Sequence, residues 1–210
     1  MITLDYFANR FNLDMAQPSP IKIFKINRPI MADCLKELGY TCGAEVGVAR
    51  GDHSELLLNT IPGLNLYCVD PWEQDSKWPN SWHDEAVKRL SPKRLPPYGG
   101  CTIIQKYSID AANDFSDGSL DFVYIDADHY FKSIADDICA WRPKVRPGGI
   151  LFGHDFHRSP TCQVSDVVTA YANAHLINPW FSLGIGEVSP AHPDLGPMYY
   201  EFPPSWMYLL

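Results

Sequence analysis

Short apolar runs alternate with helical segments along this chain, and no other sequence feature restricts the possible folds as strongly. Alternation of this kind predicts an α/β architecture with a mostly parallel sheet, helices on both faces and right-handed connections. Predicted strands occupy 42–48, 64–69, 102–105, 120–125 and 150–153. Predicted helices occupy 52–60, 84–90, 109–115, 130–144 and 164–176. The segments 180–186 and 197–202 are expected to close the sheet as a C-terminal antiparallel β pair, which makes roughly seven strands.

Two further segments frame this alternating region. The 210 residues are 46% hydrophobic and 20% charged, which fits one globular domain, 1–210, with a sizeable core. Its first part, 1–40, is predicted to be an arm followed by a helix over 29–38, because the mixed stretch 1–20 ends in two prolines. The polar and aromatic stretch 71–100 is a lid-like insertion, since loops of this length tend to be functional.

Charge and composition restrict the possible partners. The net charge of -8 offers no basic field for phosphates, so a nucleic-acid partner is not expected. There is no apolar run long enough to span a membrane, and the first residues do not resemble a signal peptide, which predicts a cytoplasmic protein. The six cysteines are scattered without zinc-ligand spacing, which favours reduced thiols. A small-molecule substrate is expected, and a homo-oligomer is equally compatible with the sequence.

A glycine-rich turn falls where the first predicted strand gives way to a helix. It contains Gly47, Ala49 and Gly51, and such a turn lets the backbone approach a ligand at a helix N-terminus. Asp70 ends the next strand, where a carboxylate can accept hydrogen bonds from ribose hydroxyls. Many strand-to-helix turns need glycine for geometry alone, so the glycines by themselves do not require a ligand. Glu45, which precedes the turn, would repel a pyrophosphate. The pattern predicts a nucleoside ligand that carries a cationic group.

This stretch resembles the first motif of class I S-adenosylmethionine-dependent methyltransferases, an acidic residue followed by GxGxG. The resemblance covers 41–155, with Ala49 in place of the middle glycine. It implies a Rossmann-like, doubly wound fold that binds S-adenosylmethionine. By the same resemblance, Glu45 lies near the methionine part of the cofactor and Asp70 binds the ribose. A nicotinamide-dependent oxidoreductase is a weaker alternative, because the glycine spacing differs from GxGxxG.

Four other residues are candidates for contact with the cofactor. His53 and Ser54, at the start of the helix, are placed to bind the carboxylate of the cofactor. The competing interpretation makes Ser54 an ordinary helix-start residue and His53 an exposed one, and for His53 this interpretation is favoured. Ser108 and Ile109 match positions that contact the adenine in the family. Ser108 is equally suited to be the N-cap of the following helix.

Polar side chains also follow two later strands of the predicted sheet. Asp126 and His129 come after the strand over 120–125, and Asp155 comes after the strand over 150–153. Because the carboxyl ends of parallel strands meet at one edge of a sheet, we expect these residues to face the same cleft as Gly51. A histidine with an ordinary pKa near about 6.5 suits removal of a proton from an acceptor hydroxyl.

The run 125–155 resembles a subfamily of small methyltransferases with an I-D-x-x-H motif, a helix, P-G-G and a final acid. That resemblance implies catalytic roles for Asp126, His129 and Asp155, with His129 as the general base. It also makes Asp126 and Asp155 candidate ligands of a divalent metal such as Mg²⁺. His154 is a departure, because metal-using relatives often have an acid there, and it weakens the case for a hard cation.

The expected activity is therefore O-methylation of a small hydroxylated metabolite. A cofactor-binding protein without turnover remains the alternative from another class. Trp72, Trp78 and Trp82 in the insertion are suited either to wall a substrate pocket or to fill the core. The pair Asp136 and Asp137, in the middle of a predicted helix, is expected on a solvated face.

Overall fold

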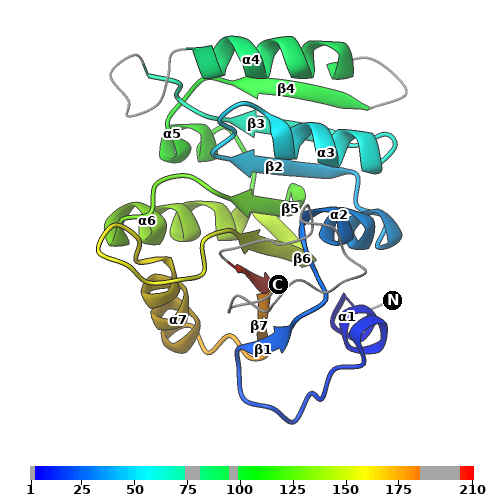
Figure 1. Ribbon diagram of the computed structural model, residues 1–210, viewed down its shortest axis with the longest axis vertical. Coiled ribbons are helices and arrows are strands. Elements are labelled where there is room, and N and C mark those ends of the chain that lie inside the picture. Colours follow the sequence, from blue (N-terminus) through cyan, green and yellow to red (C-terminus); the bar gives the residue numbers. More distant parts are fainter. Residues whose placement is uncertain (1–2, 74–80, 95–98, 185–203) are drawn as a thin grey trace, which may run out of the picture.

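A mixed sheet of eight strands, in the order β1-β7-β8-β6-β5-β2-β3-β4, forms the centre of the molecule (Figure 1). The computed structural model describes residues 3–73, 81–94, 99–184 and 204–210. The strands are β1 (Ile21–Ile23), β2 (Cys42–Val46), β3 (Asn65–Val69), β4 (Gly100–Ile104), β5 (Leu120–Ile125), β6 (Val145–Gly153), β7 (Trp180–Leu183) and β8 (Ser205–Leu209). The helices are α1 (Thr3–Phe11), α2 (Arg28–Glu37), α3 (Asp52–Thr60), α4 (Ser81–Leu90), α5 (Ser108–Ala112), α6 (Phe131–Trp141) and α7 (Val164–Ala174), with 3₁₀ turns at Ser91–Arg94 and Arg142–Lys144.

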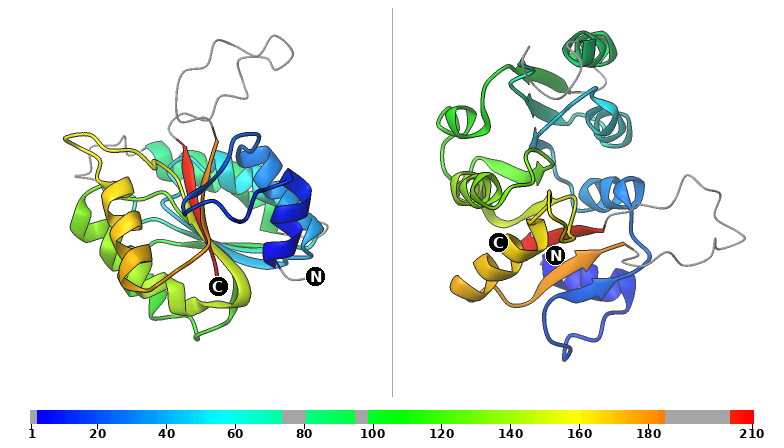
Figure 2. Two further views of the ribbon diagram at one scale, coloured as in Figure 1. Left: turned by 90° about the horizontal axis from the view of Figure 1, so that it is seen from below. Right: turned by 60° about the vertical axis from the view of Figure 1, so that its left-hand side comes forward.

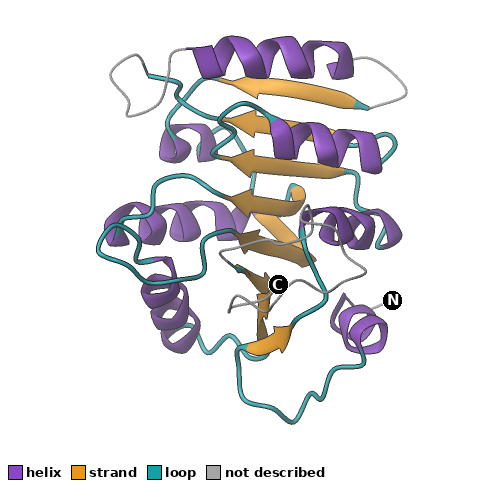
Figure 3. Ribbon diagram, in the orientation of Figure 1, coloured by secondary structure: helices purple, strands orange, loops and turns teal. Residues whose placement is uncertain are grey.

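Helices cover both faces of this sheet (Figures 2 and 3). The strands contribute alternate side chains to two separate cores, as the two-residue period of a strand requires. Phe122 and Tyr124 of β5 pack in the core beneath α1, α2 and α3. Val123 and Ile125 pack in the core beneath α6 and α7. The predicted doubly wound α/β architecture is confirmed, and this arrangement leaves the carboxyl ends of β2, β3 and β5 open at one edge.

The N-terminal segment differs from the predicted arm. Residues Thr3–Phe11 form α1, an amphipathic helix whose Phe7 is fully buried. Ile21–Ile23 then forms β1, which pairs in parallel with β7 and raises the number of strands to eight. The pattern within such a short strand is too brief to predict a partner that follows it by more than a hundred residues. The first segment is therefore part of the sheet and the core.

The antiparallel pair at the C-terminal end is confirmed, but with a different second strand. β8 lies between β6 and β7 and is antiparallel to both. The segment expected to form this strand, 197–202, lies outside the described residues, and the observed strand is Ser205–Leu209. Its side chains Trp206 and Tyr208 are buried. In the described ranges, no helix has the length and apolar character needed to cross a membrane.

Candidate active site

The glycine turn after β2 brings the ends of two strands into contact. Gly47 and Gly51 both have positive φ angles, of 91° and 79°, which an L side chain rarely adopts. A Cβ atom on Gly47 would lie 2.0 Å from the backbone oxygen of Asp126, which follows β5. Gly47 therefore has to be a glycine for close approach, and Gly51 allows the chain to enter α3. Ala49 tolerates a φ of 49° between them.

Asp70 fixes the shape of this turn. Its Oδ2 atom accepts hydrogen bonds from the backbone N–H groups of Val48 at 2.9 Å and Ala49 at 3.0 Å. Its Oδ1 atom accepts from the backbone N–H of Trp72 at 2.9 Å. The Trp72 indole in turn donates to the carbonyl oxygen of Ala49 at 2.8 Å. Backbone hydrogen bonds thus position the carboxylate that the sequence predicts for ribose.

Glu45 is held by the first turn of α3. It is only 2% exposed, and it accepts a hydrogen bond from the Ser54 hydroxyl. The Nδ1 atom of His53 lies 3.3 Å from its other oxygen. The favoured expectation that His53 is exposed is wrong, because the ring is buried against Tyr124 with 4.2 Å between ring centroids. His53 and Ser54 therefore both contact Glu45, which lies on β2 and not in the helix.

Ser108, at the start of α5, contacts a side chain of α6 instead of capping its own helix. Its hydroxyl donates to Asp137 and accepts from the indole N–H of Trp141 at 2.8 Å. No side-chain cap bond is formed at this helix start, so the N-cap interpretation is wrong. Asp137 is 4% exposed, and its expected place on a solvated face is also wrong. Asp136, its neighbour, does pair with Lys132 at the surface.

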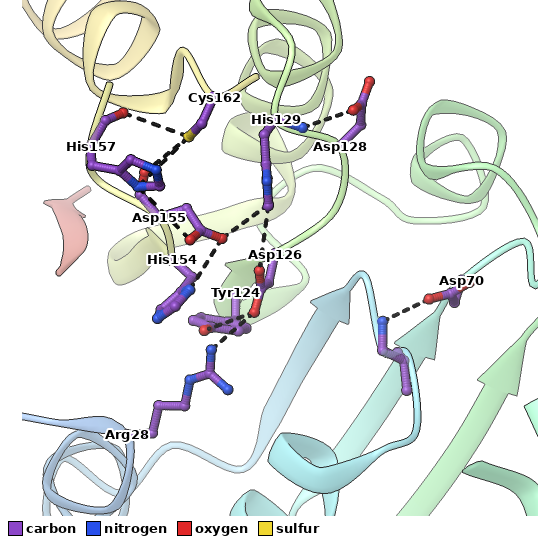
Figure 4. Close-up of polar contacts among 11 residues, drawn as sticks. Arg28, Asp70, Tyr124, Asp126, Asp128, His129, His154, Asp155, His157 and Cys162 are labelled. Carbon is purple, nitrogen blue, oxygen red and sulfur yellow. Dashed lines mark hydrogen bonds and ion pairs between the residues drawn. The ribbon is translucent and has the colours of Figure 1, made fainter. Parts of the chain in front are cut away.

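Carboxylates and imidazoles alternate at the ends of β5 and β6 (Figure 4). The Nε2 atom of His129 lies 3.0 Å from Asp155 Oδ2 and 3.9 Å from Asp126 Oδ1. These contacts with Asp126 and Asp155 raise the pKa of His129 to about 10, against the effect of burial. Burial disfavours charge on Asp155, but hydrogen bonds from His129 and His154 hold its pKa well below the usual range. At neutral pH the group is an imidazolium between two carboxylates.

The sequence did not indicate one member of this group, Arg28. It begins α2, and its guanidinium Nη2 lies 3.1 Å from Asp126 Oδ2 and over the ring of Tyr124. The contact joins residues 98 positions apart, so no local pattern could have predicted it. Asp126 therefore faces two cationic side chains, the distant Arg28 and His129, which follows it by three residues.

The same residues do not fit a hard divalent ion. Asp126, His154 and Asp155 could each turn a ligand atom to a common point, since these atoms lie within 4.8 Å of one another. One of the three donors is an imidazole nitrogen, whereas Mg²⁺ prefers oxygen. Arg28 and His129 already neutralise the two carboxylates. These three residues are therefore poor ligands for Mg²⁺.

Both groups of residues face one cleft of about 860 Å³. Of the candidate cofactor-binding residues, it is lined by Glu45, Gly47, Ala49, His53, Asp70, Ser108, Ile109 and Asp126. His129 and Asp137 also line the cleft, whereas Gly51, Ser54 and Asp155 are not among its lining residues. Trp72 and Trp82 of the insertion contribute to the wall, and Trp78 lies outside the described residues. Asp70, Asp126 and His129 therefore line one cleft as expected, whereas Gly51 and Asp155 do not line it.

A family model described as a methyltransferase domain matches residues 44–156, more than half of the chain. The chain belongs to this family. The predicted resemblance to class I methyltransferases is thereby confirmed, and the match includes both the glycine turn and Asp155. A curated relative, the uncharacterised protein y4gI of Sinorhizobium fredii, is 24% identical over 89 residues, which are 42% of this chain and 10% of that protein. The chain thus matches about a tenth of the length of that relative.

Solved structures show the same fold for this methyltransferase domain. An O-methyltransferase from Bacillus cereus, solved with S-adenosylhomocysteine, has a TM-score of 0.63 and 16% identity, covering 99% of this chain and 88% of its own. The O-methyltransferase TomG from Streptomyces achromogenes, solved with S-adenosylmethionine, has a TM-score of 0.61 and 15% identity, covering 100% and 89%. At these identities the likeness concerns the fold.

Proposed function

We propose that this chain is a single-domain, S-adenosylmethionine-dependent O-methyltransferase that acts on a small hydroxylated metabolite. The observation that carries the proposal is one cleft lined by the Asp70 turn on one side and by Asp126 and His129 on the other. Two relatives of the same fold are O-methyltransferases solved with this cofactor or its product, which supports the choice of reaction.

The donor side of the cleft matches the chemistry of the cofactor. Asp70 is placed to accept hydrogen bonds from the ribose hydroxyls, and the absence of a side chain at Gly47 lets the cofactor approach the backbone. Glu45 supplies a negative charge for the ammonium or sulfonium group, while His53 and Ser54 orient that carboxylate. Ser108 and Ile109 line the part of the cleft assigned to the adenine.

The reaction needs an oriented acceptor and a place for one proton. The acceptor oxygen attacks the methyl carbon, the bond from carbon to sulfur breaks, and the electron pair stays on sulfur as a neutral thioether. The hydroxyl proton moves to Nδ1 of a neutral His129, whose own ring proton faces Asp155 on Nε2. Asp126 and Asp155 stabilise the imidazolium that forms, because both lie within 4 Å of its Nε2 atom.

Calorimetric titration with S-adenosylmethionine tests the cofactor. We expect binding in the micromolar range, typical of small-molecule cofactors, and no binding at millimolar concentration would contradict the proposal. A parallel titration with NAD addresses the oxidoreductase alternative, which predicts the tighter binding for NAD. Transfer of a labelled methyl group to a panel of hydroxylated metabolites tests the reaction. If the cofactor binds but His129→Ala leaves every observed transfer unchanged, His129 is not the base.

A further inference from the structure

Asp137 is a buried carboxyl group that the proposed transfer step does not use. It is 4% exposed and lines the same cleft as Asp70 and Ser108. Burial raises its pKa to about 6, and the nearby acids Asp136 and Asp128 contribute in the same direction. Within the described ranges, no basic side chain forms an ion pair with it. A buried carboxyl group is costly, and the Ser108 hydroxyl supplies a hydrogen bond to only one of its two oxygens.

The hydrogen bonds around Asp137 leave one of its oxygens for a ligand. The Trp141 indole, 0% exposed, can only donate, and it donates to the Ser108 hydroxyl. A serine hydroxyl has a single proton, and that proton is given to Asp137 Oδ1. In the part of the chain that the structure describes, Oδ2 receives no hydrogen bond. This oxygen is therefore the acceptor that the cleft can present.

The position of Asp137 in the cleft is opposite to that of Glu45. Glu45 is bound by α3 on one face of the sheet, whereas Asp137 is bound through Ser108 to α5 on the other face. Asp70 follows β3, and Asp137 is bonded to Ser108, which lines the part of the cleft assigned to the adenine. If Asp70 binds the ribose, the cationic end of the cofactor extends toward Glu45 and the base extends toward Asp137. Ile109, 40% exposed, adds apolar surface for a flat ring beside it.

We propose that Asp137 recognises the 6-amino group of the cofactor's adenine. An amino group is a donor, and it matches an acceptor oxygen held in place by Ser108 and Trp141. The proposal rests on the proposed function, because it requires the cleft to bind an adenosyl cofactor. It makes Asp137 a specificity-determining residue of the donor site rather than a catalytic one.

The test compares S-adenosylhomocysteine with its analogue in which hydrogen replaces the 6-amino group, by calorimetry. The protein should bind the natural compound about 10- to 100-fold more tightly, since the analogue leaves a buried acceptor unpaired. Asp137→Asn is the decisive variant. Its amide oxygen accepts the Ser108 proton, so its NH₂ group faces the adenine, donor against donor. The preference should fall to about threefold or less, through weaker binding of the natural compound.

Asp136→Asn is the matched control, because it changes the neighbouring carboxylate, which pairs with Lys132. It should retain the full preference for the 6-amino compound. If Asp137→Asn keeps the wild-type ratio, or weakens both ligands equally, Asp137 has only a structural role and the inference is overturned. If neither ligand binds the wild-type protein, the proposed function fails and the inference fails with it. Retained binding with an unchanged ratio contradicts the inference alone.

Discussion

The two sides of the cleft are built in different ways. On the donor side, Asp70 is positioned by backbone N–H groups, and Glu45 is 2% exposed and bound by the first turn of α3. On the reaction side, Asp126, His129 and Arg28 hold one another mainly through charge. The side chain of His129 remains 37% exposed. A site positioned by the backbone keeps its geometry over a wide pH range, whereas one positioned by ion pairs changes with every proton gained or lost.

Replacement of His129 should separate the two sides most clearly. We expect His129→Ala to lower the rate of methyl transfer by about 10²- to 10⁴-fold, the usual contribution of a general base. The affinity for S-adenosylhomocysteine should change by less than about threefold, because His129 is on the reaction side. Rates with a labelled methyl donor and calorimetry measure the two effects. His175→Ala, on the exposed end of α7, is the control, and a comparable loss there would show that the assay reports stability instead.

The converse change is Asp70→Ala. It removes the carboxylate that we propose binds the ribose, and it leaves the N–H groups of Val48 and Ala49 without their acceptor. We expect affinity for S-adenosylhomocysteine to fall about 100-fold, as for the loss of two or more hydrogen bonds to a charged group. Calorimetry measures this, with the exposed Asp33→Ala on α2 as control. Unchanged affinity would mean that the ribose is bound elsewhere.

The pH dependence should belong to the reaction side alone. The pKa of His129 is raised to about 10, so the neutral imidazole becomes more abundant as pH rises toward that value. Transfer should rise about tenfold per pH unit between roughly pH 7 and 9, while donor affinity stays nearly constant. Asp126→Asn removes a carboxylate that raises this pKa, and the rise should move to lower pH. A transfer rate that is flat from pH 7 to 10 would exclude His129 as the base.

The glycine turn with Asp70 was the most predictable part of the cleft, and the reason is the range of its contacts. The helix Asp52–Thr60 and the strand Leu120–Ile125 match the prediction because a glycine turn and an apolar run are local signals. Gly47, Ala49 and Asp70 follow from the same local pattern, since the turn and the strand end are adjacent elements of one βαβ unit. The sequence of one βαβ unit is therefore enough to predict which of its residues lie at the ligand-binding edge of the sheet.

Predictions failed where a residue's environment is made by a distant segment. His53 is buried because Tyr124 of β5 packs against its ring, and Asp137 is buried because α5 supplies Ser108. Arg28 reaches Asp126 from a helix that precedes the whole alternating region. The three-residue strand Ile21–Ile23 exists only because β7 provides a partner. Because Asp137 is acidic, its sequence predicts an exposed side chain, and only the tertiary contacts explain why it is buried.

The smallest predicted effect concerns stability, and it sharpens the role of Asp137. Burial raises the pKa of this carboxyl to about 6 in the folded protein, above its usual value of 3.8. The corresponding stabilisation is complete below pH 3.8 and is lost as pH rises through about 6. Asp137→Asn keeps the Ser108 hydrogen bond without a charge, so it should raise the free energy of unfolding at neutral pH by about 1–3 kcal/mol.

Urea unfolding at pH 7.5 and pH 4 measures this difference, which should nearly vanish at the lower pH because the wild-type carboxyl is then mostly protonated. Asp136→Asn removes only a neighbouring charge that adds to this pKa, so it should show a much smaller gain. A less stable Asp137→Asn variant would mean that the carboxylate has a favourable partner in the folded protein, and that its position was selected for packing. A variant that is more stable but binds S-adenosylhomocysteine less tightly would instead show that Asp137 lowers the stability of the protein and is needed to bind the cofactor.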